Sequence, residues 1–284
     1  MHTPVLLQEA INGLKVKKDG LYIDASFGEG GHAIEIIKQG GRVLGIELDE
    51  KQYQISNIKY QKEISNIKNL KLVCGNFKNI SKIAKENNFF PVDGILFDLG
   101  LSMAQIDSSG RGFSYKKLDQ SLDMRIDLSQ EETAESIVNS YSEGELYEIF
   151  AKYSEELNSR AVAQTIFFTR RVKKIKTVKD LINAIKKAIG KEDVRVYRRI
   201  FQALRITVNK ELDNLRKGLQ GSLEILKKDG RIAVISFHSL EDRIVKNFIR
   251  ANQLKQLNKK IIRGGQNFRF ERSAKLRIIS FDNQ

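Results

Sequence analysis

The stretch Asp24-Ala-Ser-Phe-Gly-Glu-Gly-Gly-His32 decides the fold of this chain. A short β-like run over 21–23 precedes it, and an apolar helical pattern over 33–39 follows it. A strand, a glycine-rich turn and a helix in this order open a nucleotide-binding α/β domain. Glycine suits such a turn because a residue without Cβ lets the backbone bend tightly and approach a ligand. Alone, the turn is weak support, since most glycine-rich turns are only turns.

A carboxylate follows the turn at the spacing of an adenosine-binding site. The next β-like run, 42–47, ends in Glu47, and an acid about 20 residues beyond the glycines can accept hydrogen bonds from both ribose hydroxyls. The plainer interpretation of Glu47 is a solvated charge at a strand end, beside Asp49 and Glu50. Turn and acid together favour adenosine binding but do not separate NAD from S-adenosylmethionine.

Composition limits the class of protein. The chain has 284 residues, of which 41% are hydrophobic and 30% charged, so it can bury a core and is not broadly disordered. The single cysteine, Cys74, excludes an internal disulfide, fits a reducing cytosol and is expected to be inert packing in an apolar run. His2, His32 and His238 lie far apart in sequence, so no metal site is expected.

No targeting segment or membrane span is expected from the sequence. The N-terminal apolar stretch is too short for a signal peptide, and no apolar run approaches the roughly 20 residues of a membrane helix. We therefore expect a cytoplasmic protein without a membrane partner.

The net charge of +14 is unevenly distributed. Residues 119–156 hold 11 acids and 2 bases, residues 170–217 hold 16 bases and 5 acids, and residues 243–277 hold 11 bases and one acid. Most charge runs are solvated helix faces, but clustering this heavy favours a polyanion, with nucleic acid the better candidate. If these segments grip phosphates, binding should weaken steeply with salt.

Strand-like runs at 42–47, 70–75 and 92–98 alternate with helical patterns at 50–67 and 80–86 and predict a parallel sheet. Ligands bind at the carboxyl ends of such strands, where Glu47, Asn76-Phe77 and Asp98 fall. The alternation stops near residue 100, and 101–126 has no clear period, as in a functional or disordered loop.

Helical patterns follow at 131–139, 143–151, 155–172, 177–189 and 193–216. A helix over 212–227 and an Asp229-Gly230 turn precede strand-like runs at 231–237 and 275–281. We predict an α/β domain formed by 1–105 and 206–284, interrupted by a mostly helical domain at 106–205.

Several motifs, taken in order, resemble one known family. They are Asp98-Leu-Gly-Leu-Ser102, Arg111-Gly-Phe-Ser-Tyr115, Leu122-Asp-Met-Arg125, Phe201-Gln-Ala-Leu-Arg-Ile206 and Ile235-Ser-Phe-His-Ser-Leu-Glu-Asp-Arg243, with His2-Thr-Pro-Val-Leu-Leu7 at the start and Arg272-Ser-Ala-Lys-Leu-Arg277 near the end. Together with the glycine turn they resemble the RsmH, or MraW, family of bacterial small-subunit ribosomal RNA cytosine methyltransferases, over nearly the whole chain.

The resemblance implies a Rossmann-like class I methyltransferase domain with an inserted, substrate-recognising helical domain. It implies an S-adenosylmethionine-dependent enzyme that methylates the exocyclic N4 amine of one cytidine in the decoding region of 16S ribosomal RNA, in a ribosomal subunit or its precursor. Whether the protein is a homodimer is left open. The cofactor contacts that the resemblance implies are Gly30, Gly31, His32, Glu47, Phe77, Asp98 and Gln105.

This chain departs from the family at two places. The family usually has Asp where this chain has Glu47, and the longer carboxylate can still reach a ribose. The stretch before the C-terminal motif is shorter here and lacks the usual prolines, which leaves the contact between the tail and RNA undefined.

The chemistry suggests roles for individual side chains. Methyl transfer from a sulfonium needs no metal, only an aligned nucleophile. A cytosine amine is a poor nucleophile, so an acceptor for its N–H would help; Asp98 is a catalytic candidate for this, although contact with the methionine ammonium is the favoured role.

We expect His238, with Ser236 and Asp242, to help seat the target base, which must leave its stack. A hydrogen-bond network at the strand end is the plainer interpretation of these three residues.

Other residues have two open interpretations. Phe77 either packs on adenine or belongs to the core, and His32 either contacts the cofactor or caps its helix. RNA contacts or loop-ordering contacts are both open for Arg111, Arg125, Arg199 and Arg205. As whole-protein alternatives, an NAD-dependent oxidoreductase would use the same turn and Glu47, and a non-catalytic RNA-binding module would use only the basic segments.

Overall fold

The computed structural model describes residues 4–63, 69–102, 105–106, 109–258, 260–265 and 271–280. Some sequence-based expectations lie partly or wholly outside these residues: the His2-Thr3 start of the N-terminal motif, the end of the helix expected up to residue 67, parts of the loop 101–126, parts of the basic segment 243–277, and Phe281. The chain forms two compact units, Met1–Gly100 with Leu212–Gln284, and Leu101–Glu211. Each is described by itself.

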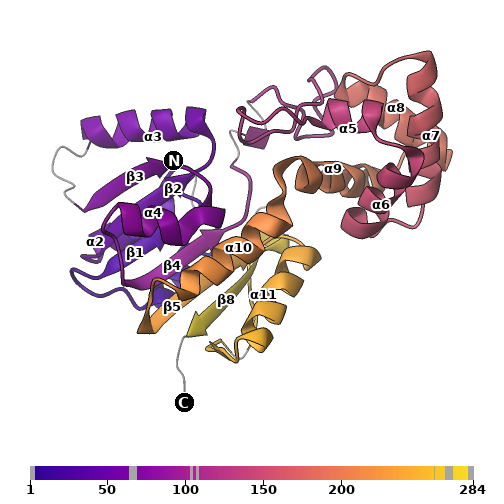
Figure 1. The fold of residues 1–284 in the computed structure, drawn as a ribbon. Helices are drawn as coiled ribbons and strands as arrows, with labels where there is room; N and C mark the ends of the chain where they lie inside the picture. Colours follow the sequence, from indigo (N-terminus) through magenta and orange to yellow (C-terminus); the bar gives the residue numbers. More distant parts are fainter. Residues whose placement is uncertain are drawn as a thin grey trace. The chain divides into compact units, whose positions relative to one another are not determined.

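The first unit is built on one mixed sheet (Figure 1). In the described part of the chain its strands are β1 (Leu21–Asp24), β2 (Arg42–Glu47), β3 (Leu70–Cys74), β4 (Val92–Asp98), β5 (Leu226–Ser236), β6 (Lys255–Gln256), β7 (Ile262–Arg263) and β8 (Lys275–Ser280). Their order is β3-β2-β1-β4-β5-β8-β6, with β7 beside β8. Strands β1 to β5 are parallel, whereas β8 runs antiparallel to β5. This is the Rossmann-like α/β arrangement that the sequence predicts, and the fold class is confirmed.

Helices cover both faces of the sheet. They are α1 (Leu7–Leu14), α2 (Gly31–Lys38), α3 (Glu50–Glu63), the 3-10 turn η1 (Phe77–Asn79), α4 (Ile80–Glu86), α10 (Glu211–Leu223) and α11 (Ser239–Ala251). Alternate residues of β4 face opposite sides: Leu96 joins the core formed with α1 and α2, while Phe97 packs on Phe77 of η1. The strand is therefore buried from both sides, as its continuous apolar run predicts.

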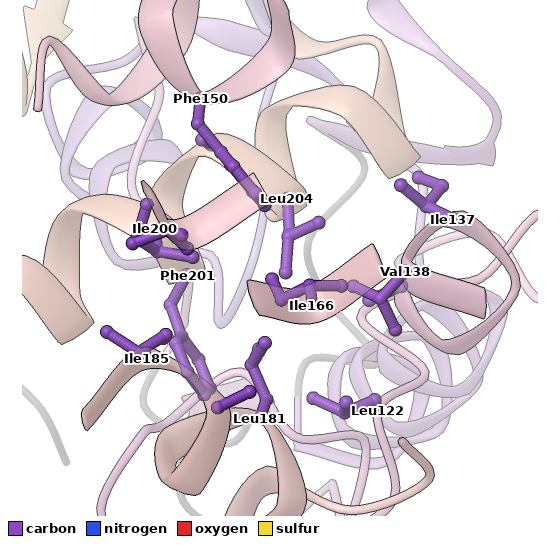
Figure 2. Packing of buried hydrophobic residues seen from close by; sticks show 14 of the residues in the cluster. Leu122, Ile137, Val138, Phe150, Ile166, Leu181, Ile185, Ile200, Phe201 and Leu204 are labelled. Carbon is purple, nitrogen blue, oxygen red and sulfur yellow. The ribbon is translucent and has the colours of Figure 1, made fainter. Parts of the chain in front are cut away.

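The second unit is helical. Its helices are α5 (Ala134–Ser140), α6 (Glu143–Ser154), α7 (Ser159–Val172), α8 (Val178–Ile189) and α9 (Val194–Asn209). Thr133, Ser142 and Thr177 begin α5, α6 and α8 with reciprocal capping boxes, which satisfy backbone N–H groups that a helix start leaves open. The helices enclose an apolar core that includes Phe150, Ile166 and Leu204 (Figure 2).

The structure corrects three details of the predicted elements. The helix expected over 193–216 is two helices, because Lys210 adopts a left-handed φ of 50° between α9 and α10. The expected Asp229-Gly230 turn does not precede β5 but lies inside it. Pairing with β4 shifts there from Val92↔Leu226 to Gly94↔Arg231, so residues 227–230 form an irregularity within the strand. Cys74 is exposed, because it ends the edge strand β3, and the prediction of inert packing is wrong.

No helix in the described ranges is both long enough and apolar enough to span a lipid bilayer.

Candidate active site at the carboxyl ends of the strands

Three neighbouring parallel strands each end in a carboxylate. Asp24 ends β1, Glu47 ends β2 and Asp98 ends β4, and β1 lies between the other two strands. Asp24 lies in register with Gly45 and Leu96, two residues before Glu47 and Asp98 on their strands. All three acids therefore fall at one edge of the sheet, where the α/β topology places ligands.

These carboxylates are poorly compensated for their burial. Burial raises the pKa of Asp24, of Glu47 and of Asp98, each to about 7. The charges of Asp98 and Glu47 further raise the pKa of Asp24. Because burial without a cation disfavours the charged form, this edge of the sheet is suited to a ligand that brings positive charge or hydrogen-bond donors.

Glu47 connects the glycine turn to the end of β2. The backbone N–H groups of Gly28 and Asp49 donate to its two carboxylate oxygens, each at 2.8 Å. These bonds favour the charged form, but burial outweighs them in the pKa. Each oxygen has two lone pairs, so the side chain keeps acceptor capacity for a further donor.

His32 and Asp98 present two acceptors to one another. His32 Nε2 lies 3.2 Å from the carbonyl oxygen of Val5, which can only accept, so this nitrogen carries the proton. Burial lowers the pKa of His32 to about 4, so the ring is neutral and Nδ1 has a free lone pair. Nδ1 lies 3.8 Å from Asp98 Oδ2. A group with several N–H bonds, such as an ammonium, would satisfy both acceptors.

The sequence left two roles open for His32, cofactor contact and helix capping. The side chain makes no capping bond at the start of α2, where Gly30 is the N-cap residue. Helix capping therefore does not explain His32.

The glycine turn is held in its bend by neighbouring side chains. Gly28 and Gly30 have φ of 54° and 77°, a region that favours glycine. Gln52 Nε2 and Ser56 Oγ donate to the Gly28 carbonyl at 3.1 and 3.0 Å. A Cβ on Gly30 would lie 2.5 Å from Phe27 Cζ, so a side chain there would displace the packed turn.

Gly31 has a different reason to be glycine. A Cβ on Gly31 would collide with the ring of Pro4. Its small size is explained by packing of the N-terminal segment, and its contact with a cofactor stays a prediction.

Phe77 and Gln105 are the two remaining predicted cofactor contacts. Phe77 is partly exposed and packs edge-on against Phe97, with ring centroids 5.6 Å apart; a core contact is present, and contact with adenine stays a prediction. Gln105 belongs to the second unit, where its Oε1 accepts from the Ser102 N–H at 3.0 Å. Its cofactor role also stays a prediction.

His238 begins α11 and is almost buried. Its Nδ1 accepts the backbone N–H of Glu241 at 3.4 Å, so the neutral ring carries its proton on Nε2. Nε2 lies 3.1 Å from Glu241 Oε1 but lacks hydrogen-bond geometry to any described group. Nε2 is buried beside this carboxylate, so contact of His238 with a target base stays a prediction.

Asp242 and Ser236 have partners of their own. Asp242 Oδ1 accepts from Arg277 Nε at 2.8 Å, and Lys246 Nζ lies 3.2 Å from its Oδ2. Ser236 Oγ is at 3.5 Å from the Lys275 carbonyl. These contacts match the alternative of a strand-end network, and they tie β8 to α11 and β5.

Comparison with known proteins decides which family holds this arrangement. The MraW methylase family matches residues 1–281, nearly the whole chain. The chain belongs to the MraW methylase family. Family membership favours methyl transfer over both the oxidoreductase and the non-catalytic alternatives, which the sequence alone left open.

Relatives of this MraW-family chain carry one name. It is 47% identical over 256 residues to the ribosomal RNA small subunit methyltransferase H of Halothermothrix orenii, covering 88% of this chain and 81% of the relative. The protein of the same name from Thermosipho africanus is 41% identical over 288 residues, covering 98% and 96%.

Among solved structures, a putative methyltransferase of Streptococcus mutans in complex with SAH has 14% identity and a TM-score of 0.43, covering 99% of each chain.

The four arginines singled out in this MraW-family sequence order the insert. Arg111 Nη1 donates to the carbonyls of Arg125 and Ile126, and Arg125 forms a two-pronged contact with Asp123. Arg199 and Arg205 pair with Glu156 and Glu211. The 111–126 segment is therefore a structured loop, and Arg111 and Arg125 order it. Arg199 and Arg205 pair with acids outside this loop, and RNA contact by any of the four stays a prediction.

Sequence reasoning missed several residues that shape the site of this family member. Asp24 was overlooked, although it ends a strand as Glu47 and Asp98 do, so the rule that found them could have found it. Ser26 Oγ accepts the Asp98 N–H at 2.7 Å, and the Tyr60 hydroxyl donates to the Glu29 carbonyl. The Tyr60 contact joins residues that are 31 positions apart and the Ser26 contact residues that are 72 positions apart. No local sequence pattern predicts contacts at such separations.

Proposed function

We propose that this protein is an S-adenosylmethionine-dependent methyltransferase that methylates the exocyclic N4 amine of a specific cytidine in the decoding region of 16S ribosomal RNA. One observation carries the proposal: three uncompensated carboxylates meet a glycine turn at the strand ends of a chain that belongs to the MraW methylase family. The relatives' shared name supports ribosomal RNA of the small subunit as the substrate.

The residues present fit the proposed cofactor. S-adenosylmethionine has a sulfonium, an ammonium and two ribose hydroxyls, which are cationic groups or donors. The carboxylates of Asp24, Glu47 and Asp98 supply the opposite character, and the turn at Gly30 leaves no room for a side chain. When bound, the cofactor supplies a methyl group already activated by positive sulfur.

Asp98 and His32 would hold the ammonium group. When Asp98 is charged, its Oδ2 and His32 Nδ1 are two acceptors 3.8 Å apart, and a ligand ammonium would supply the donor that they then lack. The Asp98 side chain is 22% exposed and can be reached by a ligand, while Asp24 is 1% exposed and would act behind it through its charge. Glu47 would accept from the ribose hydroxyls while keeping its bonds to the turn.

The amine of cytosine needs positioning more than activation. Its lone pair is delocalised into the ring, so alignment with the methyl group is the main requirement. We infer a positioning role for His238, whose buried Nε2 would have to turn from Glu241 toward the base edge to donate to it. Asp98 is occupied with His32 and the ammonium in this scheme, so we assign it to cofactor binding.

The RNA would be gripped by the basic segments 170–217 and 243–277. Phosphate contacts release counterions, so affinity should fall steeply with salt. A target base that must leave its stack is reached at least cost in a loop or single strand. Small-subunit RNA within a ribosomal subunit or its precursor offers such a site, in a cytoplasmic setting.

The decisive experiment follows the methyl group. Wild-type protein and Asp98→Asn are incubated with tritium-labelled S-adenosylmethionine and either free 16S RNA or small subunits lacking the modification, and the RNA fragments are analysed by mass spectrometry. One added methyl on a single cytidine N4, absent with Asp98→Asn, is expected. No transfer to either substrate by a wild-type protein that binds the cofactor would overturn the proposal, and the two substrates separate free RNA from the assembled subunit.

A further inference from the structure

One face of α7 presents an aromatic and basic stripe to solvent. Arg160, Gln164, Phe168 and Arg171 are exposed and recur at intervals of four, four and three residues. This spacing places them on one side of the helix. Phe168 is 52% exposed, so its ring is open to a ligand.

Guanidinium groups lie over the ring of Phe168 and over that of its neighbour Phe167. The Arg171 guanidinium carbon lies 4.5 Å from the Phe167 ring centre and 5.6 Å from that of Phe168. Arg170 lies 4.9 Å from the Phe167 ring and is fixed there because its Nη1 donates to the Val138 carbonyl at 2.9 Å. The rings of Phe167 and Phe168 are edge to face, 5.7 Å apart. The flat groups are thus held in place before any ligand arrives.

The surroundings of the stripe are strongly basic. Residues 170–179 hold six bases and no acid. Asp180 neutralises part of this charge by pairing with Lys173, with 3.1 Å between Nζ and Oδ1. Aromatic faces beside a run of cations are what proteins use to bind single-stranded nucleic acid, since bases stack on the rings while the phosphates meet the cations.

We propose that the end of α7, with Phe168 and Arg171 at its centre, is a stacking platform for unpaired bases of the RNA substrate. This inference deepens the proposed function and rests on it. Phe168 stacks on a base, and Arg171 extends the stack and contacts a phosphate. The lysines at 173, 174, 176 and 179 contact further phosphates of the RNA backbone. The platform reads no particular base, because every base has a π-face.

The lack of tryptophan in this chain allows a direct test. Phe168→Trp places a single reporter on the platform, and Leu157→Trp places one at a matched control position. Leu157 is 98% exposed in the same unit but is flanked by Glu155 and Glu156. Each variant is titrated with a single-stranded fragment of 16S RNA and with an abasic oligonucleotide of the same length.

We expect RNA with bases to quench the tryptophan emission of the Phe168→Trp variant and the abasic chain to leave it unchanged, with no quenching at the control position. Equal quenching by both oligonucleotides would mean phosphate contact without stacking and would overturn the platform. An emission change that depends on protein concentration alone would mean that a second copy of the chain covers the face, and would also overturn it.

Binding and activity provide the second measurement. Phe168→Ala should weaken RNA affinity by about 5- to 150-fold, the range for one lost base–aromatic stack, with an unchanged salt slope, and Phe168→Tyr should restore it. Arg171→Ala should lower the salt slope by about 0.7. Cofactor affinity should stay at the wild-type value in all three. Wild-type RNA affinity in Phe168→Ala, in a protein that still methylates RNA, would refute the platform alone; a wild type that never methylates would refute the proposed function.

Discussion

A buried acid in each unit shows two different uses of burial. Glu156 in the second unit is 8% exposed, and Asp24 in the first is 1% exposed. Burial opposes ionisation of both, but hydrogen bonds from Asn158 and Arg199 outweigh it for Glu156, and its pKa is lowered. Asp24, Glu47 and Asp98 have no such cation among the described residues, and burial raises their pKa values. A buried acid with its partner present maintains structure, whereas one without a partner marks where a ligand belongs.

The largest expected effect comes from removing the charge of Asp98. Asp98→Asn should weaken S-adenosylmethionine binding by about 3 kcal/mol, or roughly 150-fold, because an ion contact at a desolvated site is lost. The same change should raise the melting temperature of the ligand-free protein most at pH 8, where Asp98 is charged and its burial is unfavourable, less at pH 5, and little below the unfolded-state pKa of about 4. Calorimetric titration and thermal melts measure the two effects, and a variant less stable at pH 8 would break the comparison.

The pH dependence of cofactor binding should follow the same acids. Protonated carboxylates must lose a proton to hold a cation, so affinity should rise as pH increases from 5 to about 7, by about tenfold per unit for each acid that ionises on binding. The amino group of the ligand stays charged in this range. Titrations in buffers of different ionisation enthalpy count the released protons. Uptake of protons, or an affinity that is flat from pH 5 to 7, would contradict the raised pKa values.

The acid of the second unit should behave in the opposite way. Glu156→Gln should destabilise the protein by about 1 kcal/mol at pH 7, since the bonds from Arg199 and Asn158 lose their charge. The lowered pKa means that this contribution is present above the unfolded-state value near 4 and is lost as pH falls. Denaturant unfolding at pH 7 and pH 3 tests this, with cofactor affinity expected at the wild-type value. A loss of cofactor affinity in Glu156→Gln would contradict the assignment of Glu156 to structure rather than to ligand binding.

The smallest effect is expected from shortening Glu47. Glu47→Asp keeps the charge but should lose the 2.8 Å bond from the Gly28 N–H, a change of about 1 kcal/mol, or fivefold, in cofactor affinity. Glu47→Gln is the matched control, because it keeps the length and removes the charge. If the shorter acid weakens binding more than the neutral one, reach to the turn matters more than charge.

Much of the first unit could be predicted from sequence because its signals are local. The runs at 42–47 and 92–98 and the helix at 80–86 have the predicted bounds, since buried parallel strands and amphipathic helices leave short-range patterns. The break at Lys210 and the pairing of β5 before its Asp229-Gly230 turn have no such short-range pattern. A single left-handed residue and a register shift depend on tertiary packing.

The candidate site was predicted less completely than the fold. Glu47 and Asp98 were found as acids at strand ends, while the 3.8 Å approach of His32 to Asp98 and the missing donor there appear only when α2 is packed on the sheet. The arginine–aromatic stripe of α7 was hidden for the opposite reason. In sequence only its last member, Arg171, lies in the basic segment 170–217, and only the helix packing and exposure bring it together with Arg160, Gln164 and Phe168 on one side of the helix.

The position of β5 in the sheet also bears on how the protein is made. This strand pairs with β4 on one side and with β8, from the end of the chain, on the other, and the whole second unit is synthesised between β4 and β5. During translation the first four strands therefore wait with an open edge while more than a hundred residues emerge. Ribosome-bound chains in which residues up to Glu211 have emerged should not retain the cofactor, whereas chains in which β8 has also emerged should capture it, so methylation competence requires both β5 and β8.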